Sequence, residues 1–248
     1  MSSVLVTGAA SGIGRATAIA LAAAGRDLIL WDLDAEGLAE TMAQAIEHEV
    51  TVTTADFDVT DDDLRHEQLD AARMFHPVIG GLVHAAGISG PEPISTFTTA
   101  GWNAVINLNL TISAALTHEL ANDLEAAGDG AIVYLSSIEG YFGHEWLPAY
   151  CSSKAGLLGL ARAAGHELAK RGVRVNCVCP GAIETPMLAP LLAFDGFRDS
   201  VTTRTPLGRV GQPDDIADAI VFLLSASARF ITGTSLIVDG GLTTIGGI

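Results

Sequence analysis

The stretch Val4-Leu-Val-Thr-Gly8-Ala-Ala-Ser-Gly12-Ile-Gly14 decides the fold of this chain. A short apolar run ends at Thr7, and the glycines precede an alanine-rich helical pattern that reaches about residue 24. Glycine lets the backbone turn tightly and approach a ligand closely. The first N–H groups of the helix and its dipole favour a pyrophosphate there. The stretch predicts a dinucleotide-binding loop, and a turn that merely needs glycine is the alternative interpretation.

The rest of the chain alternates short apolar runs with helical patterns. Strands are expected at 27–31, 51–55, 81–84, 131–135, 174–179 and 235–239, and helices at 36–48, from 60, and at 101–127, 150–170 and 213–224. Such alternation predicts βαβ units and a parallel sheet that is buried on both faces. No linker or repeat divides the chain. We predict one α/β domain over residues 1–248, a Rossmann-type doubly wound parallel sheet of about seven strands with helices on both faces.

Composition excludes several classes of protein. The 13 basic and 29 acidic residues give a net charge of −16, which argues against nucleic acid and anionic membranes as partners. No uncharged apolar run of about 18 residues suggests a membrane span. The start of the chain lacks a basic region before its first strand, so a cytoplasmic location is expected. Cys151, Cys177 and Cys179 are expected to be reduced thiols, and no histidine spacing predicts a metal site.

Asp32 stands 18 residues after Gly14, at the end of the second expected strand. A carboxylate at about this distance accepts hydrogen bonds from the adenosine ribose and repels a 2′-phosphate. Leu33 and Ser11 occupy positions where a basic side chain would hold that phosphate, which favours NAD over NADP. Arg15 and Arg26 lie nearby in sequence and have no assigned role, and a solvated strand-end aspartate is the alternative.

Tyr150 and Lys154 stand four residues apart in an expected helix, which brings their Cβ atoms to about 5–6 Å. A phenol has a pKa near 10, and a cation beside it favours the phenolate and lowers the pKa. We therefore expect Tyr150 to act as an acid/base whose pKa is lowered by Lys154. The same pair also occurs by chance on many helices.

With Thr7-Gly8-x-x-x-Gly12-x-Gly14 and Tyr150-x-x-x-Lys154, the sequence resembles the short-chain dehydrogenase/reductases over nearly its whole length. The resemblance implies that Ser137 hydrogen-bonds the substrate oxygen, with Ser136 as the less favoured choice. It implies that Asn109 holds a water in a proton relay behind Lys154, with Asn107 as the fallback. The implied catalytic set is Asn109, Ser137, Tyr150 and Lys154.

The resemblance also implies a set of residues around the cofactor. They would contact its phosphates, ribose, adenine and nicotinamide, and are Gly8, Ser11, Gly12, Ile13, Gly14, Asp32, Leu33, Asp58, Val59, Ala85, Ala86, Gly87, Tyr150, Lys154, Pro180, Gly181, Ile183 and Thr185. One departure is visible, because the family usually has Asn-Asn-Ala-Gly where this chain has His84-Ala85-Ala86-Gly87. We expect His84 to be a buried histidine with satisfied hydrogen bonds, and the missing asparagines put the support of the sheet there in doubt.

The substrate is expected to meet the stretch between Ser137 and Tyr150. The candidate substrate residues are Ser137, Glu139, His144 and Trp146, with Tyr141 beside them, and Met187 from an apolar segment. That segment, roughly 185–210, is hard to assign and is interpreted as a mobile lid. Glu139 and His144 are alternatively rim residues that face water, and the segment is alternatively a helix that faces a partner.

The function that these features favour is an NAD-dependent oxidoreductase that interconverts a secondary alcohol and a ketone. The alternatives are a 3-oxoacyl-thioester reductase using NADPH, an epimerase or dehydratase of the same fold, and a non-catalytic NAD-binding sensor. The net charge disfavours an acidic acyl carrier as partner. The resemblance implies a homotetramer, with a dimer as the second choice, paired through the helices at 101–127 and 150–170.

Overall fold

Seven parallel strands form one sheet in the computed structural model, which describes residues 2–243. The order across the sheet is β3-β2-β1-β4-β5-β6-β7, and every neighbouring pair is parallel. The strands are β1 Ser3–Thr7, β2 Leu28–Asp32, β3 Val52–Asp56, β4 Ile79–His84, β5 Ala131–Leu135, β6 Arg174–Pro180 and β7 Ser235–Val238. The chain runs outward from β1 to β3 and then crosses to β4, so the strand order reverses between β1 and β4. The predicted fold class is confirmed, and ligands of such sheets bind at this reversal.

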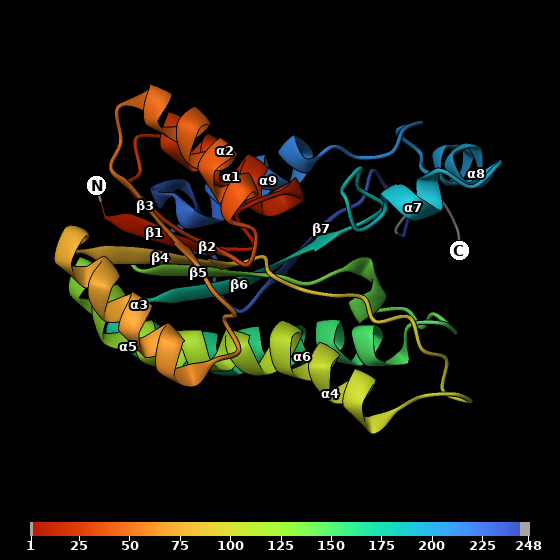
Figure 1. Ribbon diagram of the computed structural model, residues 1–248, viewed down its shortest axis with the longest axis horizontal. Coiled ribbons are helices and arrows are strands. Elements are labelled where there is room, and N and C mark those ends of the chain that lie inside the picture. Colours follow the sequence, from red (N-terminus) through yellow and green to blue (C-terminus); the bar gives the residue numbers. More distant parts are fainter. Residues whose placement is uncertain (1, 244–248) are drawn as a thin grey trace.

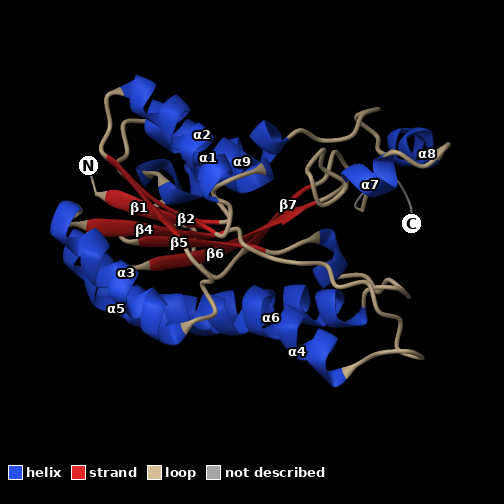
Figure 2. Ribbon diagram, in the orientation of Figure 1, coloured by secondary structure: helices blue, strands red, loops and turns tan. Residues whose placement is uncertain are grey.

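Helices cover both faces of the sheet (Figures 1 and 2). One layer contains α1 Gly12–Ala23, α2 Ala35–Ala45 and α9 Pro213–Leu224. The other layer contains α3 Asp62–Phe75, α4 Thr99–Ile106, α5 Ile112–Ala127 and α6 Pro148–Leu168. The short helices α7 Ala189–Leu192 and α8 Phe197–Arg204 lie beyond the carboxyl end of β7.

Two apolar cores, one on each face, hold the layers together. Side chains alternate along each strand, so Leu5 packs towards α5 and α6, whereas Val4 and Val6 pack towards α1 and α9. All three are fully buried. Burial on both faces explains why the strands are continuous apolar runs in the sequence, and it makes the sheet a rigid platform for the loops at its carboxyl edge.

The helix expected at 101–127 is interrupted, which corrects that prediction. A π-helical turn, η2 Asn107–Thr111, separates α4 from α5. Asn109 lies in this turn with its side chain fully buried. The amide of Asn109 makes three hydrogen bonds outside the helix, described below, and these contacts offset the poorer hydrogen-bond geometry of the wider turn.

Residues 185–210, which were hard to assign from the sequence and were interpreted as a mobile lid, contain α7, α8 and a small apolar cluster. Leu192, Val201 and Val210 are buried together there. Glu184 accepts hydrogen bonds from Arg198 at 2.7 Å and from Gln212 at 3.1 Å, which ties both ends of the segment together. The residues are locally packed because their apolar side chains cover one another.

Candidate active site

The glycine loop after β1 packs directly against the loop after β4. A Cβ atom on Gly8, where φ is +68°, would lie 2.6 Å from the backbone nitrogen of Ala86. A Cβ atom on Gly14 would lie 1.9 Å from the carbonyl oxygen of Gly8. Both positions therefore require glycine for packing of the protein itself. The glycine loop leaves the N-terminus of α1 exposed at the point where the strand order reverses.

Asp32 holds the glycine loop from the end of β2. Its Oδ2 accepts a hydrogen bond from the backbone nitrogen of Ala10 at 2.9 Å, and its Oδ1 accepts one from Leu33 at 2.7 Å. The carboxylate is thus fixed beside the loop. A negative charge in this place attracts ribose hydroxyls and repels an additional phosphate.

The two arginines that the sequence left without a role, Arg15 and Arg26, both have partners within the protein. Arg15 forms a salt bridge with Glu40 at 2.8 Å and donates to Thr41 at 3.1 Å. Arg26 donates to the carbonyl oxygen of Ser2 at 2.6 Å, at the amino end of the sheet. Arg15 therefore joins α1 to α2, and Arg26 anchors the start of β1.

The remaining cofactor candidates lie around the same carboxyl edge. Gly12 faces Thr185, whose methyl carbon would be 3.4 Å from a Cβ atom on that glycine. Asp58 is exposed and accepts from the hydroxyl group of Thr60 at 2.7 Å, and Val59 is buried. Other candidates lie at the start of α1, at the end of β6, or in the loops that follow β4 and β6: Ser11, Ile13, Ala85, Ala86, Gly87, Pro180, Gly181 and Ile183. A glycine cradle, a helix N-terminus and a fixed carboxylate together fit a dinucleotide.

Tyr150 and Lys154 come from the first turns of α6, which begins at Pro148, a residue suited to the first turn of a helix. Lys154 is buried, and its Nζ lies 5.3 Å from the centre of the Tyr150 ring. The same Nζ donates a hydrogen bond to the carbonyl oxygen of Leu135 at 2.7 Å. Burial lowers the pKa of Lys154 to about 8.

The electrostatics of Tyr150 differ from the sequence-based expectation. Burial raises the pKa of Tyr150 to about 12, the hydrogen bond with Ser137 opposes that shift, and the Glu139 carboxylate reinforces it. Lys154 was expected to lower this pKa, but the net shift is upward because burial of the phenol is its largest cause. The amine faces the ring and Leu135, and the cost of desolvating the phenolate is the largest effect.

The two serines after β5 have different roles. Ser136 is buried and its hydroxyl group donates to the backbone carbonyl oxygen of Lys154 at 2.8 Å, so it attaches α6 to the sheet. Ser137 accepts from the backbone nitrogen of Glu139 at 3.1 Å and interacts with the phenol of Tyr150. This geometry favours Ser137 over Ser136 as the serine that meets a substrate oxygen.

Asn109 connects the π-helical turn to the loop after β4 and to α6. Its Nδ2 donates to the carbonyl oxygen of Ile88 and to the hydroxyl oxygen of Ser153, both at 3.0 Å, and its Oδ1 accepts from the Ile88 nitrogen at 3.0 Å. A Cβ atom on Gly87 would lie 3.0 Å from Asn109 Oδ1 and 3.7 Å from Lys154 Nζ. Asn109 therefore lies beside the lysine, as the resemblance implies.

His84 is buried and satisfied, as expected from the sequence. Its Nδ1 lies 2.8 Å from Thr7 Oγ1, and its Nε2 lies 2.9 Å from the carbonyl oxygen of Leu108. Burial lowers the pKa of His84 to about 4, and the nearby Lys154 cation acts in the same direction. The ring is neutral at pH 7, and its hydrogen bonds supply cross-links between β1, β4 and η2 at the place of the missing asparagines.

The proposed substrate residues are not all brought together. Glu139 is half-buried and close enough to raise the pKa of Tyr150, and it accepts a hydrogen bond from Cys151 Sγ at 3.7 Å. His144, Trp146 and Met187 are exposed, so for His144 the rim position is the one that the structure supports.

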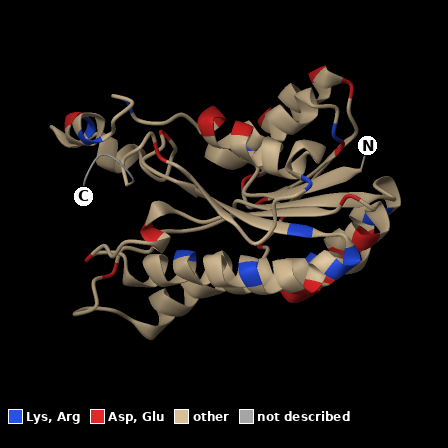
Figure 3. Ribbon diagram, turned by 180° about the vertical axis from the view of Figure 1, so that it is seen from behind, with Lys and Arg blue, Asp and Glu red and all other residues tan. Residues whose placement is uncertain are grey.

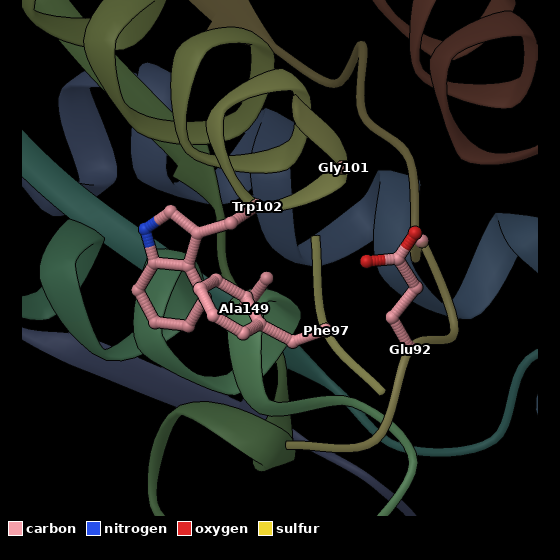
Figure 4. Close-up of a pocket in the computed structure, with 6 residues that line it drawn as sticks. Glu92, Phe97, Gly101, Trp102 and Ala149 are labelled. Atoms are coloured by element: carbon pink, nitrogen blue, oxygen red, sulfur yellow. The ribbon is translucent and has the colours of Figure 1, made fainter. Parts of the chain in front are cut away.

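A small pocket next to α6 was not foreseen from the sequence (Figure 4). It borders Ala149, the neighbour of Tyr150, and the rings of Phe97 and Trp102 pack edge to face there with centres 6.0 Å apart. Glu92 accepts a hydrogen bond from the Thr98 nitrogen at 2.9 Å and fixes the start of α4. The sequence offered one signal, the aromatic residues Phe97, in the loop after β4, and Trp102, in α4, but both lie far from Tyr150 along the chain.

Comparison with known proteins identifies the family of this chain. Residues 8–243 match a family model described as enoyl-(acyl carrier protein) reductase. The chain belongs to the short-chain dehydrogenase/reductase family. As a short-chain dehydrogenase/reductase, it is an NAD(P)-dependent oxidoreductase that acts on CH–OH and C=O groups.

Two relatives align with this short-chain dehydrogenase/reductase over almost their full length. The cis-4-hydroxycyclohexanecarboxylate dehydrogenase of Sinomonas cyclohexanicum is 39% identical, with 97% of this chain and 96% of that protein covered. The 3-oxoacyl-[acyl-carrier-protein] reductase of Thermotoga maritima is 36% identical, with 96% of each chain covered.

Solved structures give the same result. Levodione reductase has a TM-score of 0.91 at 32% identity, with 97% of this chain and 96% of that chain covered. A 2-deoxy-D-gluconate 3-dehydrogenase candidate from Agrobacterium tumefaciens, with bound NADP, has a TM-score of 0.88 at 33% identity and the same coverage.

Two further observations apply to residues 2–243 of this short-chain dehydrogenase/reductase. No helix in that range is both long enough and apolar enough to cross a bilayer. No group of three or more His, Cys, Asp and Glu side chains in that range is arranged to hold a metal ion.

Proposed function

We propose that this enzyme uses NAD to interconvert a secondary alcohol and a ketone, with Tyr150 as the acid/base. The observation that carries the proposal is the position of Tyr150 between Ser137 and Lys154, at the edge of the sheet that holds the glycine loop. A sensor without turnover would need none of these three side chains. The runner-up is reduction of a 3-oxoacyl thioester with NADPH.

Each side chain of the proposed site has a separate role in the reaction. A bound nicotinamide supplies or accepts the hydride. In alcohol oxidation Tyr150 takes the hydroxyl proton, and in ketone reduction it donates a proton to the developing alkoxide. Ser137 donates a hydrogen bond to the oxygen on which charge develops. Lys154 contributes a positive charge next to the Tyr150 ring, and Asn109 holds the loop and helix that flank the lysine.

The preference for NAD rests on Asp32 and on the arginines. The carboxylate of Asp32 is fixed next to the glycine loop, where it repels a 2′-phosphate. Arg15 is paired with Glu40, and Leu33 brings no charge. NADP remains the alternative cofactor, because a structurally similar protein binds it.

An uncharged substrate suits the surroundings of Tyr150. Glu139 is half-buried there, and among residues 2–243 no lysine or arginine forms a salt bridge with it. In Figure 3 the loops at the carboxyl edge of the sheet carry acidic positions, and basic ones lie mainly on the helices. A carboxylate or an acidic carrier would be repelled by this field. We infer that the substrate is a small or medium neutral alcohol or ketone.

The remaining expectations belong to the same proposal. The segment 185–210 would close over the substrate, since Thr185 at its start faces Gly12. The subunits would assemble as a homotetramer, or else a dimer, through α5 and α6. Light scattering after size-exclusion chromatography measures the assembly, and a monomer would contradict it.

A substrate screen tests the function directly. Neutral cyclic alcohols with NAD⁺ or NADP⁺, and the matching ketones with the reduced cofactors, are followed by the absorbance of the reduced nicotinamide. We expect turnover of cyclohexanol-like compounds with NAD⁺ at a higher kcat/KM than with NADP⁺. Turnover confined to 3-oxoacyl thioesters with NADPH would favour the runner-up.

A further inference from the structure

Three hydrogen bonds in series run through His84 and join three separate segments. A carbonyl oxygen can only accept, so the bond to Leu108 places the proton of the neutral ring on Nε2. Nδ1 then accepts from the Thr7 hydroxyl group, whose oxygen accepts in turn from the Ala86 nitrogen at 3.3 Å. One tautomer therefore satisfies the entire series, from the loop after β4 to the π-helical turn.

The series continues from the π-helical turn to the catalytic helix. Leu108 precedes Asn109, whose amide binds both backbone groups of Ile88 and the hydroxyl oxygen of Ser153. Ser153 donates to the backbone carbonyl oxygen of Tyr150 at 2.7 Å. The loop that flanks the cofactor site and the first turn of α6 are thus linked by short contacts through buried side chains.

We propose that His84 is a positioning residue for the reaction: its Nε2–H holds the π-helical turn and thereby sets the place of Asn109 and of the Tyr150 turn relative to the cofactor loop. His84 itself contacts none of the reacting groups. The kinetic part of this inference rests on the proposed function, because turnover is one of its measurements.

The two nitrogens of the ring can be tested separately. The amide nitrogen of glutamine reaches about as far as Nε2 of histidine, whereas that of asparagine reaches about as far as Nδ1. His84→Gln can therefore keep the donor to Leu108, and His84→Asn can keep a partner for Thr7. Both variants retain a polar amide, and asparagine is one methylene group smaller, so the exchange control at 213–224 reports any general loosening that the smaller volume causes. The proposal assigns the effect on turnover to the Leu108 contact.

The experiment compares wild type, His84→Gln and His84→Asn as full-length proteins. Measured are kcat and KM for an alcohol, the Kd for NADH by fluorescence, and hydrogen–deuterium exchange of peptides from 107–111 and, as a control, from 213–224. We expect His84→Gln to keep kcat within about threefold, and His84→Asn to lower it by about tenfold or more, as small misplacements do. NADH binding should stay within about threefold, and faster exchange in His84→Asn should be confined to 107–111.

Equal kcat in the two variants, or exchange that rises as much at 213–224 as at 107–111, would overturn the proposal and leave His84 a purely stabilising residue. The exchange measurement needs no turnover. If wild type oxidises no alcohol, the proposed function fails, and the difference in local exchange between the two variants still decides the role of His84.

Discussion

The amine of Lys154 lies 5.3 Å from the centre of the Tyr150 ring and donates its hydrogen bond to the carbonyl oxygen of Leu135. The cation therefore acts on the face of the ring, where it is attracted by the π-electrons. The pKa of the Tyr150 hydroxyl group is shifted by burial, by Ser137 and by Glu139. The pair is adjacent, as the spacing of four predicts, but burial of the phenol has the largest effect on the pKa of Tyr150.

Removal of the Tyr150 hydroxyl group should abolish most turnover. Tyr150→Phe keeps the ring that Lys154 faces but can no longer exchange a proton with the substrate. We expect kcat to fall by about 10²–10⁴-fold, the usual contribution of a general acid or base. The Kd for NADH, measured by fluorescence, should change by no more than a few fold. Turnover close to that of wild type would show that another group handles the proton.

Alanine substitution should affect mainly stability at Ser136 and mainly turnover at Ser137. Ser136→Ala removes the hydrogen bond to the Lys154 carbonyl oxygen and should reduce the free energy of unfolding by about 1 kcal/mol. Ser137→Ala removes the donor to the substrate oxygen and should lower kcat by about 10²-fold. Denaturant titration and steady-state kinetics on both variants make the comparison. If Ser136→Ala has the larger effect on kcat, the roles are reversed.

The Glu139 carboxylate should delay the ionisation of Tyr150. It raises the pKa of the phenol, so Glu139→Gln should make the phenolate, and hence alcohol oxidation, available at lower pH. We expect the rising limb of kcat/KM for oxidation to shift downward by about half a pH unit, a size typical of a charge at a few ångströms. Initial rates between pH 6 and 10 measure the shift. An unchanged or upward-shifted limb would mean that Glu139 does not act on Tyr150.

Asp32 should set the cofactor preference. Asp32→Ala removes the charge that repels a 2′-phosphate, and we expect the ratio of kcat/KM for NADP⁺ to that for NAD⁺ to rise by about tenfold, which corresponds to about 1.4 kcal/mol. Asp32→Asn is the matched control for the loss of charge with the hydrogen bonds to the loop retained in part. A wild-type protein that is already faster with NADP⁺ would refute the role of Asp32.

His84 should make the protein less stable in acid. The unfolded chain takes up a proton near pH 6.5, whereas the buried ring does so only near pH 4, so the stability contributed by the neutral ring is complete above pH 6.5 and is lost as the pH falls towards 4. Relative to pH 7, wild type should lose about 2–3 kcal/mol more than His84→Gln by pH 4.5. Urea titrations give both curves, and carboxylates and His76 cancel in the difference. Parallel curves would exclude a depressed pKa for His84.

The parts of the fold that depend on repeating patterns were predictable from the sequence. Apolar runs placed the strands within a residue or two, and the glycines of Gly8–Gly14 placed the first crossover. Asp32, Ser137, Tyr150 and Lys154 could be proposed from the sequence because their spacing is local or matches a family. The direction of the Lys154 side chain was not predictable, because it depends on a hydrogen bond to the carbonyl oxygen of Leu135, at the end of β5.

Features that depend on contacts between distant segments escaped the sequence. The interruption at 107–111 is stabilised by Asn109 binding Ile88 and Ser153, 21 and 44 residues away. The packing of 185–210 depends on Glu184 meeting both Arg198 and Gln212. The pocket at Ala149 requires Phe97 and Trp102 to fold back onto α6. None of these three features produces a periodic pattern in the sequence of the segment that contains it.

The wide turn at 107–111 makes the length of this region as constrained as its composition. Each residue rotates a helix by about 100°, so a deletion there would swing the start of α5 around its axis relative to α4. Either Asn109 would leave its partners, or Leu116, Leu120 and Leu124 would leave the core. A change in length within this segment should therefore disturb either the site or the core, as a substitution of Asn109 itself would.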